Sequence, residues 1–179
     1  MMKKLFIFSS FLILIMSSAH AINCNLDIFK INKDKSQFKE ILKVFPTRQA
    51  MEDIEVTNFP IEYYCGDSEA NGTIISIFFM KDKVVRIIYG NSIGKERALF
   101  NIANEKYKIG FKENQKLINA KEPENYAIKK NKIYYLYGRK IGKNENEGKF
   151  FEVLEFADIE TEEIIAEKMS KIEENETNN

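Results

Sequence analysis

The chain has 179 residues, of which 27 are basic and 27 acidic, with one histidine and no tryptophan. This length suits one domain, or two small ones fused, with a hydrophobic core of its own. The balanced charge gives no electrostatic reason to expect nucleic acid or an anionic membrane as a partner.

The first 21 residues have the order of a secretory signal peptide. Two lysines precede an apolar run over 5–16, and small residues lead to a cleavage site after Ala21. The apolar run is shorter than the roughly 20 residues that a membrane-spanning helix needs. We therefore expect a periplasmic or exported protein without stable membrane insertion. Cleavage also removes His20, the only histidine.

Two cysteines remain, Cys24 and Cys65, and an even pair in an oxidising compartment predicts one disulfide. Closing so long a loop contributes about 4 kcal/mol to stability in the chain-entropy model. A metal or redox role is less favoured, because no other soft ligand accompanies the two thiols. We expect no cofactor and no metal.

Apolar spacing predicts the elements of the first half. A strand is expected over 25–31, followed by a helix that ends at Pro46. After a polar connection, strands are expected over 61–65, 73–80 and 84–90, the last two joined by a short polar turn. The predicted disulfide would tie the N-terminal strand to the inner side of this sheet.

The second half has the same order of elements. A helix over about 95–108 precedes β-like runs at 126–129, 132–139 and 149–156, and a third helix is expected over about 159–173. Helix starts near 33, 94 and 158 suggest a repeated unit of one helix and three strands, although few residues match between the halves.

These elements predict an α+β fold in which helices pack on one face of an antiparallel sheet. A single domain is expected over 22–174, with halves at 22–93 and 94–174 if the repeat is real, and a polar tail over 175–179. The architecture looks like that of small secreted inhibitory or assembly proteins built from helix-plus-meander units. This likeness of fold implies no activity.

Loss of the histidine limits the catalytic chemistry of the mature chain. Serine triads, cysteine–histidine dyads and most zinc sites need that residue type, so carboxylate, lysine or tyrosine chemistry remains. Paired acids occur at Glu52 with Asp53 and at Glu122 with Glu124, but a chain this rich in acids supplies such neighbours by chance.

The segment YGNSIGKER places Ser92 and Lys95 at the SxxK spacing of penicillin-recognising serine enzymes. The companion SDN and KTG elements are missing, and Ser92 stands before a predicted helix, where a hydroxyl is a natural cap. The segment also resembles a phosphate-binding loop, but Gly90 and Gly94 are one residue too close and Glu96 replaces the required Ser or Thr. We interpret both matches as accidental.

The strand IYYLYGRK places Tyr135, Tyr137 and Arg139 on one side. If one face of the sheet is open, tyrosine and arginine there are typical of protein interfaces, with Tyr64 and Arg86 as neighbours. The alternative is that both faces are buried, or that the tyrosines form cross-strand pairs.

The stretch GDSEANGTII, residues 66–75, fits a hairpin turn, a calcium loop or a sugar acceptor. Asp67 and Glu69 suit the first positions of a calcium loop, but Phe78 stands where a bidentate glutamate is needed. A strand also begins inside the loop, so the calcium interpretation is disfavoured.

Two sequons remain, at Asn71 and Asn175. An acidic residue stands two places before each asparagine, namely Glu69 and Glu173. This pattern resembles the extended acceptor sequence of the bacterial periplasmic N-glycosylation system. The resemblance implies sugars on Asn71 and Asn175 in a host that has that system.

The sequence therefore favours a non-enzymatic protein-binding module, such as an inhibitor, adaptor or assembly factor, whose partner is another envelope protein. The alternative from a different class is a small hydrolase that uses carboxylates or the Ser92 and Lys95 pair. A third hypothesis is a carrier that holds an apolar ligand between helices and sheet.

Overall fold

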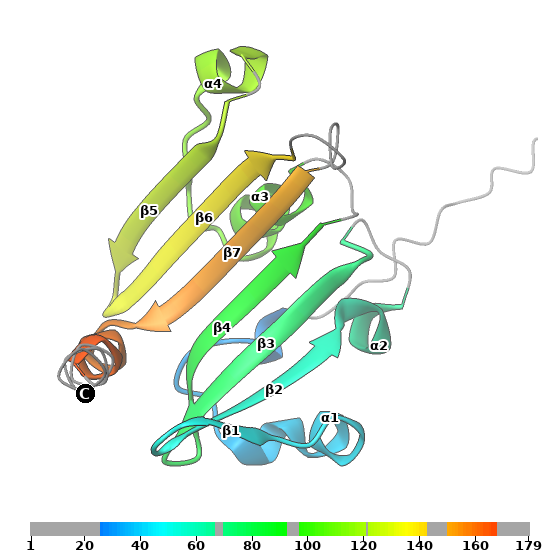
Figure 1. Ribbon diagram of the computed structural model, residues 1–179, viewed down its shortest axis with the longest axis vertical. Coiled ribbons are helices and arrows are strands. Elements are labelled where there is room, and N and C mark those ends of the chain that lie inside the picture. Colours follow the sequence, from blue (N-terminus) through cyan, green and yellow to red (C-terminus); the bar gives the residue numbers. More distant parts are fainter. Residues whose placement is uncertain (1–25, 67–69, 93–96, 121, 143–149, 168–179) are drawn as a thin grey trace, which may run out of the picture.

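The chain forms one seven-stranded antiparallel sheet with helices, an α+β fold as predicted. The computed structural model describes residues 26–66, 70–92, 97–120, 122–142 and 150–167. The strand order is β1-β2-β3-β4-β7-β6-β5, so the last strand lies inside the sheet, between β4 and β6 (Figure 1). The strands are β1 Arg48–Met51, β2 Ile54–Pro60, β3 Thr73–Met80, β4 Lys83–Asn91, β5 Glu124–Lys130, β6 Ile133–Ile141 and β7 Phe150–Asp158.

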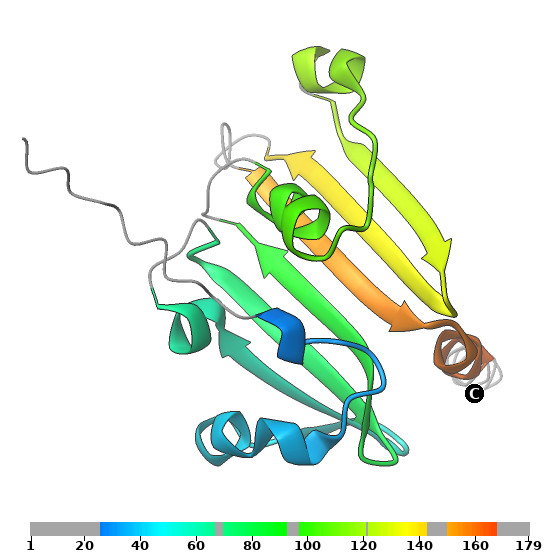
Figure 2. The same ribbon diagram turned by 180° about the vertical axis from the view of Figure 1, so that it is seen from behind.

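Short helices cover one face of this sheet (Figure 2). They are η1 Leu26–Ile28, η2 Lys35–Phe38, α1 Lys39–Val44, α2 Ile61–Cys65 and α3 Ala98–Asn101 with its π-helical continuation η3 Ile102–Lys106. The helix α4 Gln115–Ala120 stands beyond the end of β5 instead of on the sheet (Figure 1). A further helix over 159–167 follows β7. The core between helices and sheet is rich in aromatic rings. Phe29, with no exposed surface, packs against the rings of Phe38, Phe59 and Tyr64.

Tight turns fix the register of two hairpins. Lys81 and Asp82, with φ of 50° and 58°, join β3 to β4, and Asn131 and Lys132, with φ of 51° and 61°, join β5 to β6. Positive φ at both central residues matches the right-handed twist of paired strands. Because side chains alternate along a strand, this register decides which residues face the helices.

Most of the predicted elements are present. The strands over 73–80 and 84–90 are β3 and β4, and the three strands of the second half are β5, β6 and β7. The repeat is not confirmed, because the first half has four strands and the inserted helix α2, whereas the second half has three strands. The third predicted helix is described only as far as residue 167.

Two predicted strands are wrong. Residues 26–28 form the helical turn η1 instead of part of a strand over 25–31, and residues 61–65 form α2. In α2 the side chains of Ile61 and Cys65, one helical turn apart, are both buried. This burial outweighs the β-rich composition, which is a weak preference that depends on context. The segment expected as a polar connection contains β1 and β2.

Cys65 is 1% exposed and disulfide-bonded. Its pairing with Cys24 stays a prediction, because Cys24 lies outside the described residues. The predicted signal peptide and the polar tail also lie outside them. Within the described part of the chain, no helix is long and apolar enough to cross a membrane.

Candidate functional site

A row of polar residues crosses five strands on the helix-covered face, at the end where β4 and β6 finish. Neighbours in the row are register partners, and each is at most 5% exposed. The row consists of Thr73, Asn91, Glu152, Arg139 and Glu124. Buried polar groups need hydrogen-bond or charge partners inside the protein. The carboxylates of Glu124 and Glu152 find these partners in neighbouring side chains and in the backbone of α3.

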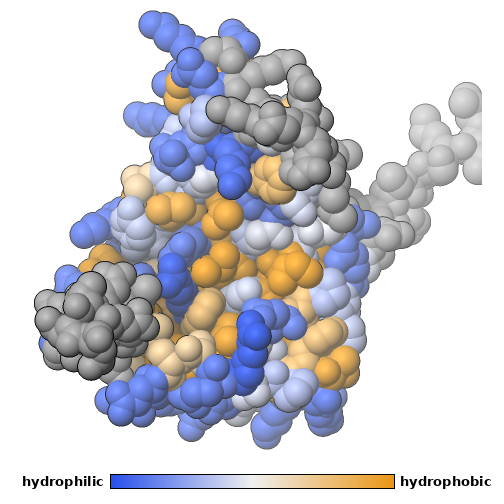
Figure 3. Space-filling model, viewed as in Figure 1, coloured by the Kyte–Doolittle hydropathy of each residue, from blue (hydrophilic) through white to orange (hydrophobic). Residues whose placement is uncertain are grey.

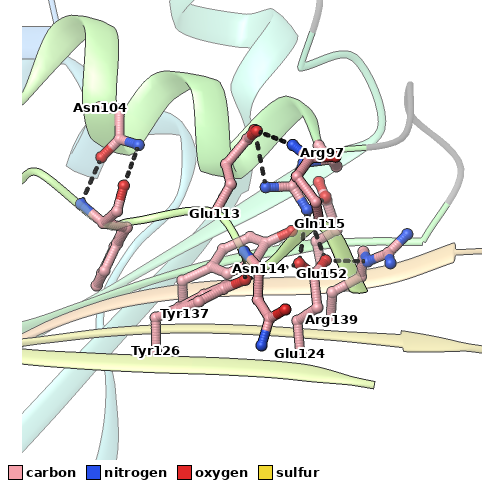
Figure 4. Close-up of polar contacts among 11 residues, drawn as sticks. Arg97, Asn104, Glu113, Asn114, Gln115, Glu124, Tyr126, Tyr137, Arg139 and Glu152 are labelled. Carbon is pink, nitrogen blue, oxygen red and sulfur yellow. Dashed lines mark hydrogen bonds and ion pairs between the residues drawn. The ribbon is translucent and has the colours of Figure 1, made fainter. Parts of the chain in front are cut away.

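Glu124 lies at the centre of an ion-pair cluster (Figure 4). Arg97 Nη1 donates to both of its oxygens, at 2.8 and 2.6 Å, and Arg139 Nε lies 2.6 Å from Oε2. The Tyr126 hydroxyl donates to Oε1 at 2.8 Å. Burial alone would raise the pKa of Glu124, but the hydrogen bonds from Arg97 and Tyr126 and the nearby positive charges lower it. Glu124 is therefore held in its charged form.

Glu152 stands on the other side of Arg139 and connects the sheet to helix α3. Its carboxylate accepts hydrogen bonds from the Tyr137 hydroxyl at 2.8 Å and from the Leu99 backbone N–H at 3.1 Å. Burial raises the pKa of Glu152 despite these donors. The two glutamates of the row thus have pKa values shifted in opposite directions, as in paired acid–base sites.

A second group of polar contacts fastens the connection between η3 and α4 (Figure 4). The Asn104 side chain accepts from the Phe111 backbone N–H at 2.8 Å and donates to its carbonyl at 3.0 Å. The Asn114 N–H donates to the Tyr126 hydroxyl at 3.0 Å. Through Tyr126 this connection is joined to the Glu124 cluster.

The arrangement fits a structural role better than acid–base chemistry. The carboxylates of Glu124 and Glu152 are 0% and 2% exposed, and protein donors occupy them. A substrate would reach them only if the covering segments moved away. Within the described residues, no group of three or more His, Cys, Asp or Glu side chains could hold a metal ion.

The opposite face of the sheet carries apolar side chains at its surface (Figure 3). Ile74 is 46% exposed and Val153 is 38% exposed. The register places the partly buried side chains of further apolar residues on the same face: Phe78, Ile88, Tyr134, Leu136 and Phe151. We call this surface the open face. An antiparallel sheet with one solvated face usually alternates apolar and polar residues, so an apolar open face is unusual.

Two glycines lie on either side of Val153 on the open face. Gly90 on β4 and Gly138 on β6 are both register partners of Val153 on β7. A Cβ atom added at Gly90 would have no neighbour within 4 Å. Glycine weakens a strand interior and marks places where another group approaches closely. A Cβ atom added at Gly138 would lie 3.2 Å from Asn125 Oδ1, so the Asn125 side chain occupies the space above this glycine.

The predicted interface residues do not form one surface. Tyr137 and Arg139 are 0% and 3% exposed on the helix-covered face, so the prediction that they belong to an open interface is wrong. Tyr135 is half-buried on that same face, and Tyr64 packs against Phe29. Only Arg86 lies on the open face, where it pairs with Glu155 at 2.7 Å.

The other candidate residues are scattered. Glu122 is exposed whereas Glu124 is buried, and Ser92 is exposed while Lys95 lies outside the described residues. Asn71 is partly buried in the turn before β3, and the Thr73 of its sequon has no exposed surface. Asn175 lies outside the described residues.

The remaining acidic pair, Glu52 and Asp53, is exposed in the turn between β1 and β2.

No family model, curated protein or solved structure matches this chain. The open face and the polar row are therefore interpreted from their own chemistry.

Proposed function

We propose that this chain is an exported, non-enzymatic protein-binding module that binds another protein through the open face of its sheet. The observation that carries the proposal is the apolar surface around Ile74 and Val153, on the face opposite α1, α2 and α3. The helix that follows β7 reaches this face only near Arg86, where Glu162 lies 3.6 Å from the Arg86 Nε. Exposed apolar patches on soluble proteins mark interaction sites more often than random surface. The signal-peptide pattern of the sequence supports export, and an envelope protein is the expected kind of partner.

The exposed apolar groups are large enough to contribute to affinity. Full burial of a side chain such as isoleucine or valine contributes about 1.5–3 kcal/mol. Covering the exposed portions of Ile74 and Val153, 46% and 38%, would supply about 2 kcal/mol together. That corresponds to about thirtyfold in the dissociation constant.

The carrier hypothesis has weaker support. A cavity of about 200 Å³ lies on the helix side of the sheet, and its lining residues are Lys30, Ile31, Tyr107, Ile133, Tyr135 and Phe156. Pockets that enclose drug-sized ligands have volumes of about 300–1,000 Å³. The cavity therefore suits at most a small apolar molecule.

The proposal is tested with the double variant Ile74→Glu/Val153→Glu. Both side chains are exposed, so the fold should survive, while two carboxylates on the open face oppose docking. We expect recovery of the partner from a native extract to fall at least about thirtyfold.

The matched control is Val44→Glu on α1, since Val44 is 54% exposed and lies on a helix at the opposite face. It should bind like the wild type. Unchanged recovery with the double variant would contradict the proposal.

A further inference from the structure

A hollow of about 620 Å³ lies on the open face, over β1, β2 and β3 at one edge of the sheet (Figure 1). Its volume is within the range of about 300–1,000 Å³ that is typical of binding pockets. None of the described residues that line it is acidic. The lining combines polar and apolar side chains, among them Arg48, Val56, Asn58, Ile74, Ser76 and Phe78.

The polar lining residues form a line across the three strands, with Arg48 on β1, Asn58 on β2 and Ser76 on β3. Amide orientations are assigned from the hydrogen-bond network. In the orientation that satisfies both ends of its side chain, Asn58 donates to Ser76 Oγ at 2.8 Å and accepts from Arg48 Nη2 at 3.2 Å. Asn58 and Ser76 thus hold the guanidinium group at the hollow.

The charge of Arg48 is not neutralised within the described part of the chain, where this exposed side chain has no carboxylate partner. A guanidinium group has five N–H donors in a planar fork, and this geometry fits a carboxylate. Asn58 accepts from Nη2 only. Arg48 therefore has donors and a positive charge that a carboxylate from outside can use.

Apolar side chains lie on both sides of the polar line. On β3, Ile74 and Phe78 stand two residues before and two residues after Ser76 on the same face, and Ile74 is 46% exposed. Val56 on β2 is the register partner of Phe78. Four residues of a strand span about 13 Å, so an apolar side chain has room over Ser76, between Ile74 and Phe78.

We infer that the partner binds this hollow with an Asp or Glu side chain on Arg48 and an adjacent apolar side chain between Ile74 and Phe78. This inference rests on the proposed function, because the hollow is part of the open face. The carboxylate accepts the N–H donors that Asn58 leaves available. The apolar side chain covers Ser76 and the exposed part of Ile74.

The position of the hollow favours a protein segment over a small carboxylate. Ile74 is the register partner of Gly90, which is the register partner of Val153. Val153 is therefore two strand spacings, or about 10 Å, from a residue that lines the hollow. A small molecule in the hollow would leave Val153 exposed, whereas a protein segment covers the hollow and the apolar surface together.

The lining also argues against a second copy of this chain docked through the same hollow. Two hollows brought face to face would place Arg48 against Arg48, with no acidic lining residue between them. Juxtaposed like charges oppose association. The expected occupant is therefore a different protein that supplies the missing carboxylate.

The test is site-specific photocrosslinking in the native host, with p-benzoylphenylalanine at position 50. Ala50 is exposed on β1 and lines the hollow. Mass spectrometry identifies the crosslinked partner segment and its nearest acidic residue. Arg48→Glu in the same background should lower the crosslink yield at least about tenfold, because like charges then face each other. Changing that acidic residue of the partner to lysine should restore the yield to within about threefold.

The matched control for charge is Lys129→Glu. Lys129 is exposed on β5, at the other edge of the sheet, and belongs to the same register row of the open face as Arg48. Six strand spacings, about 29 Å, separate the two residues. Lys129→Glu should crosslink within about twofold of the wild type. Urea unfolding should show Arg48→Glu to be as stable as the wild type, because Arg48 is exposed.

Several outcomes would overturn this inference and leave the proposed function standing. They are a yield insensitive to Arg48→Glu, an equal loss with Lys129→Glu, a loss that the partner's lysine does not restore, and a crosslink to the same chain or to a second copy. Another is a small carboxylate that native mass spectrometry finds bound through Arg48. Absence of any crosslink, while Ile74→Glu/Val153→Glu still loses its partner, would place binding elsewhere on the open face.

A different result would reject the proposed function itself. It is the absence of any crosslink together with normal partner recovery by Ile74→Glu/Val153→Glu. The two proposals can therefore fail separately.

Discussion

Replacing Glu124 with glutamine tests whether the buried cluster holds the second half of the fold together. Glu124 is fully buried, accepts hydrogen bonds from Arg97 through both oxygens and has Arg139 Nε at 2.6 Å. Glutamine keeps the shape but removes the charge, and its amide N–H groups would point toward guanidinium donors. Two arginine side chains, 12% and 1% exposed, would lose their shared counter-ion.

Removing one partner of a buried ion pair costs about 3–5 kcal/mol, because the other charge stays buried. For a domain of this size, such a loss lowers the Tm by about 6–20 °C. Urea unfolding followed by far-UV circular dichroism, with the disulfide oxidised, measures the free energy of unfolding. The control is Glu40→Gln, since the Glu40 side chain is 81% exposed and pairs with Lys43 within α1. Its cost should stay below about 1 kcal/mol.

The cost of Glu124→Gln should depend on pH. The pKa of Glu124 is lowered from its ordinary value of 4.5, because the hydrogen bonds and charges of the arginines outweigh the effect of burial. A lowered pKa means that the carboxylate contributes stability above the ordinary pKa, and that this contribution is lost as the pH falls through the lowered value. The cost should therefore be full near neutral pH and shrink in acid. A cost no larger than that of Glu40→Gln at neutral pH, or one that is independent of pH, would refute the structural role of Glu124.

Two further predictions concern the neighbouring parts of the fold. Burial raises the pKa of Glu152, so its stabilising contribution is present below the ordinary pKa of 4.5 and is lost as the pH rises through the raised value. The Tm of Glu152→Gln should therefore rise relative to that of the wild type as the pH increases from acid to neutral. A difference in Tm that is the same at every pH would contradict this prediction. Cys65 is disulfide-bonded, so Cys65→Ser should lower the free energy of unfolding by about 2–5 kcal/mol. The wild type treated with reductant should have the same free energy of unfolding as that variant. If the wild type unfolds at the same urea concentration with and without reductant, the prediction is wrong.

Much of the fold follows from local patterns in the sequence. Long β-rich runs with short turns predict β3, β4 and the three strands of the second half. The helix α2 could not be predicted in this way, because Ile61, Tyr63 and Cys65 fit strand alternation while Ile61 and Cys65 also fit one helical turn. Only the packing of both side chains into the core decides between these two patterns.

Only part of the candidate surface could be predicted from the sequence. The run TIISIFFM is apolar at both parities, which indicates a strand with two apolar faces, and its exposed half contains Ile74. The assignment of Tyr137 and Arg139 to an open face failed because alternation shows which residues share a face but not which face the helices cover. The polar row depends on the register of five strands, and a one-residue shift in any strand would remove that strand's contribution.

The two faces of the sheet explain why binding and stability should be separable in this chain. The aromatic core and the Glu124 cluster lie on the helix-covered face, so most of the stabilising contacts do not involve the open face. Substitutions at Ile74 or Gly90 therefore change little of the folded state, because Ile74 is 46% exposed and a Cβ atom added at Gly90 would have no neighbour within 4 Å. A loss of partner binding by such variants with unchanged urea unfolding would locate the function on the open face. Equal losses of binding and stability would instead indicate that the apolar surface serves the fold.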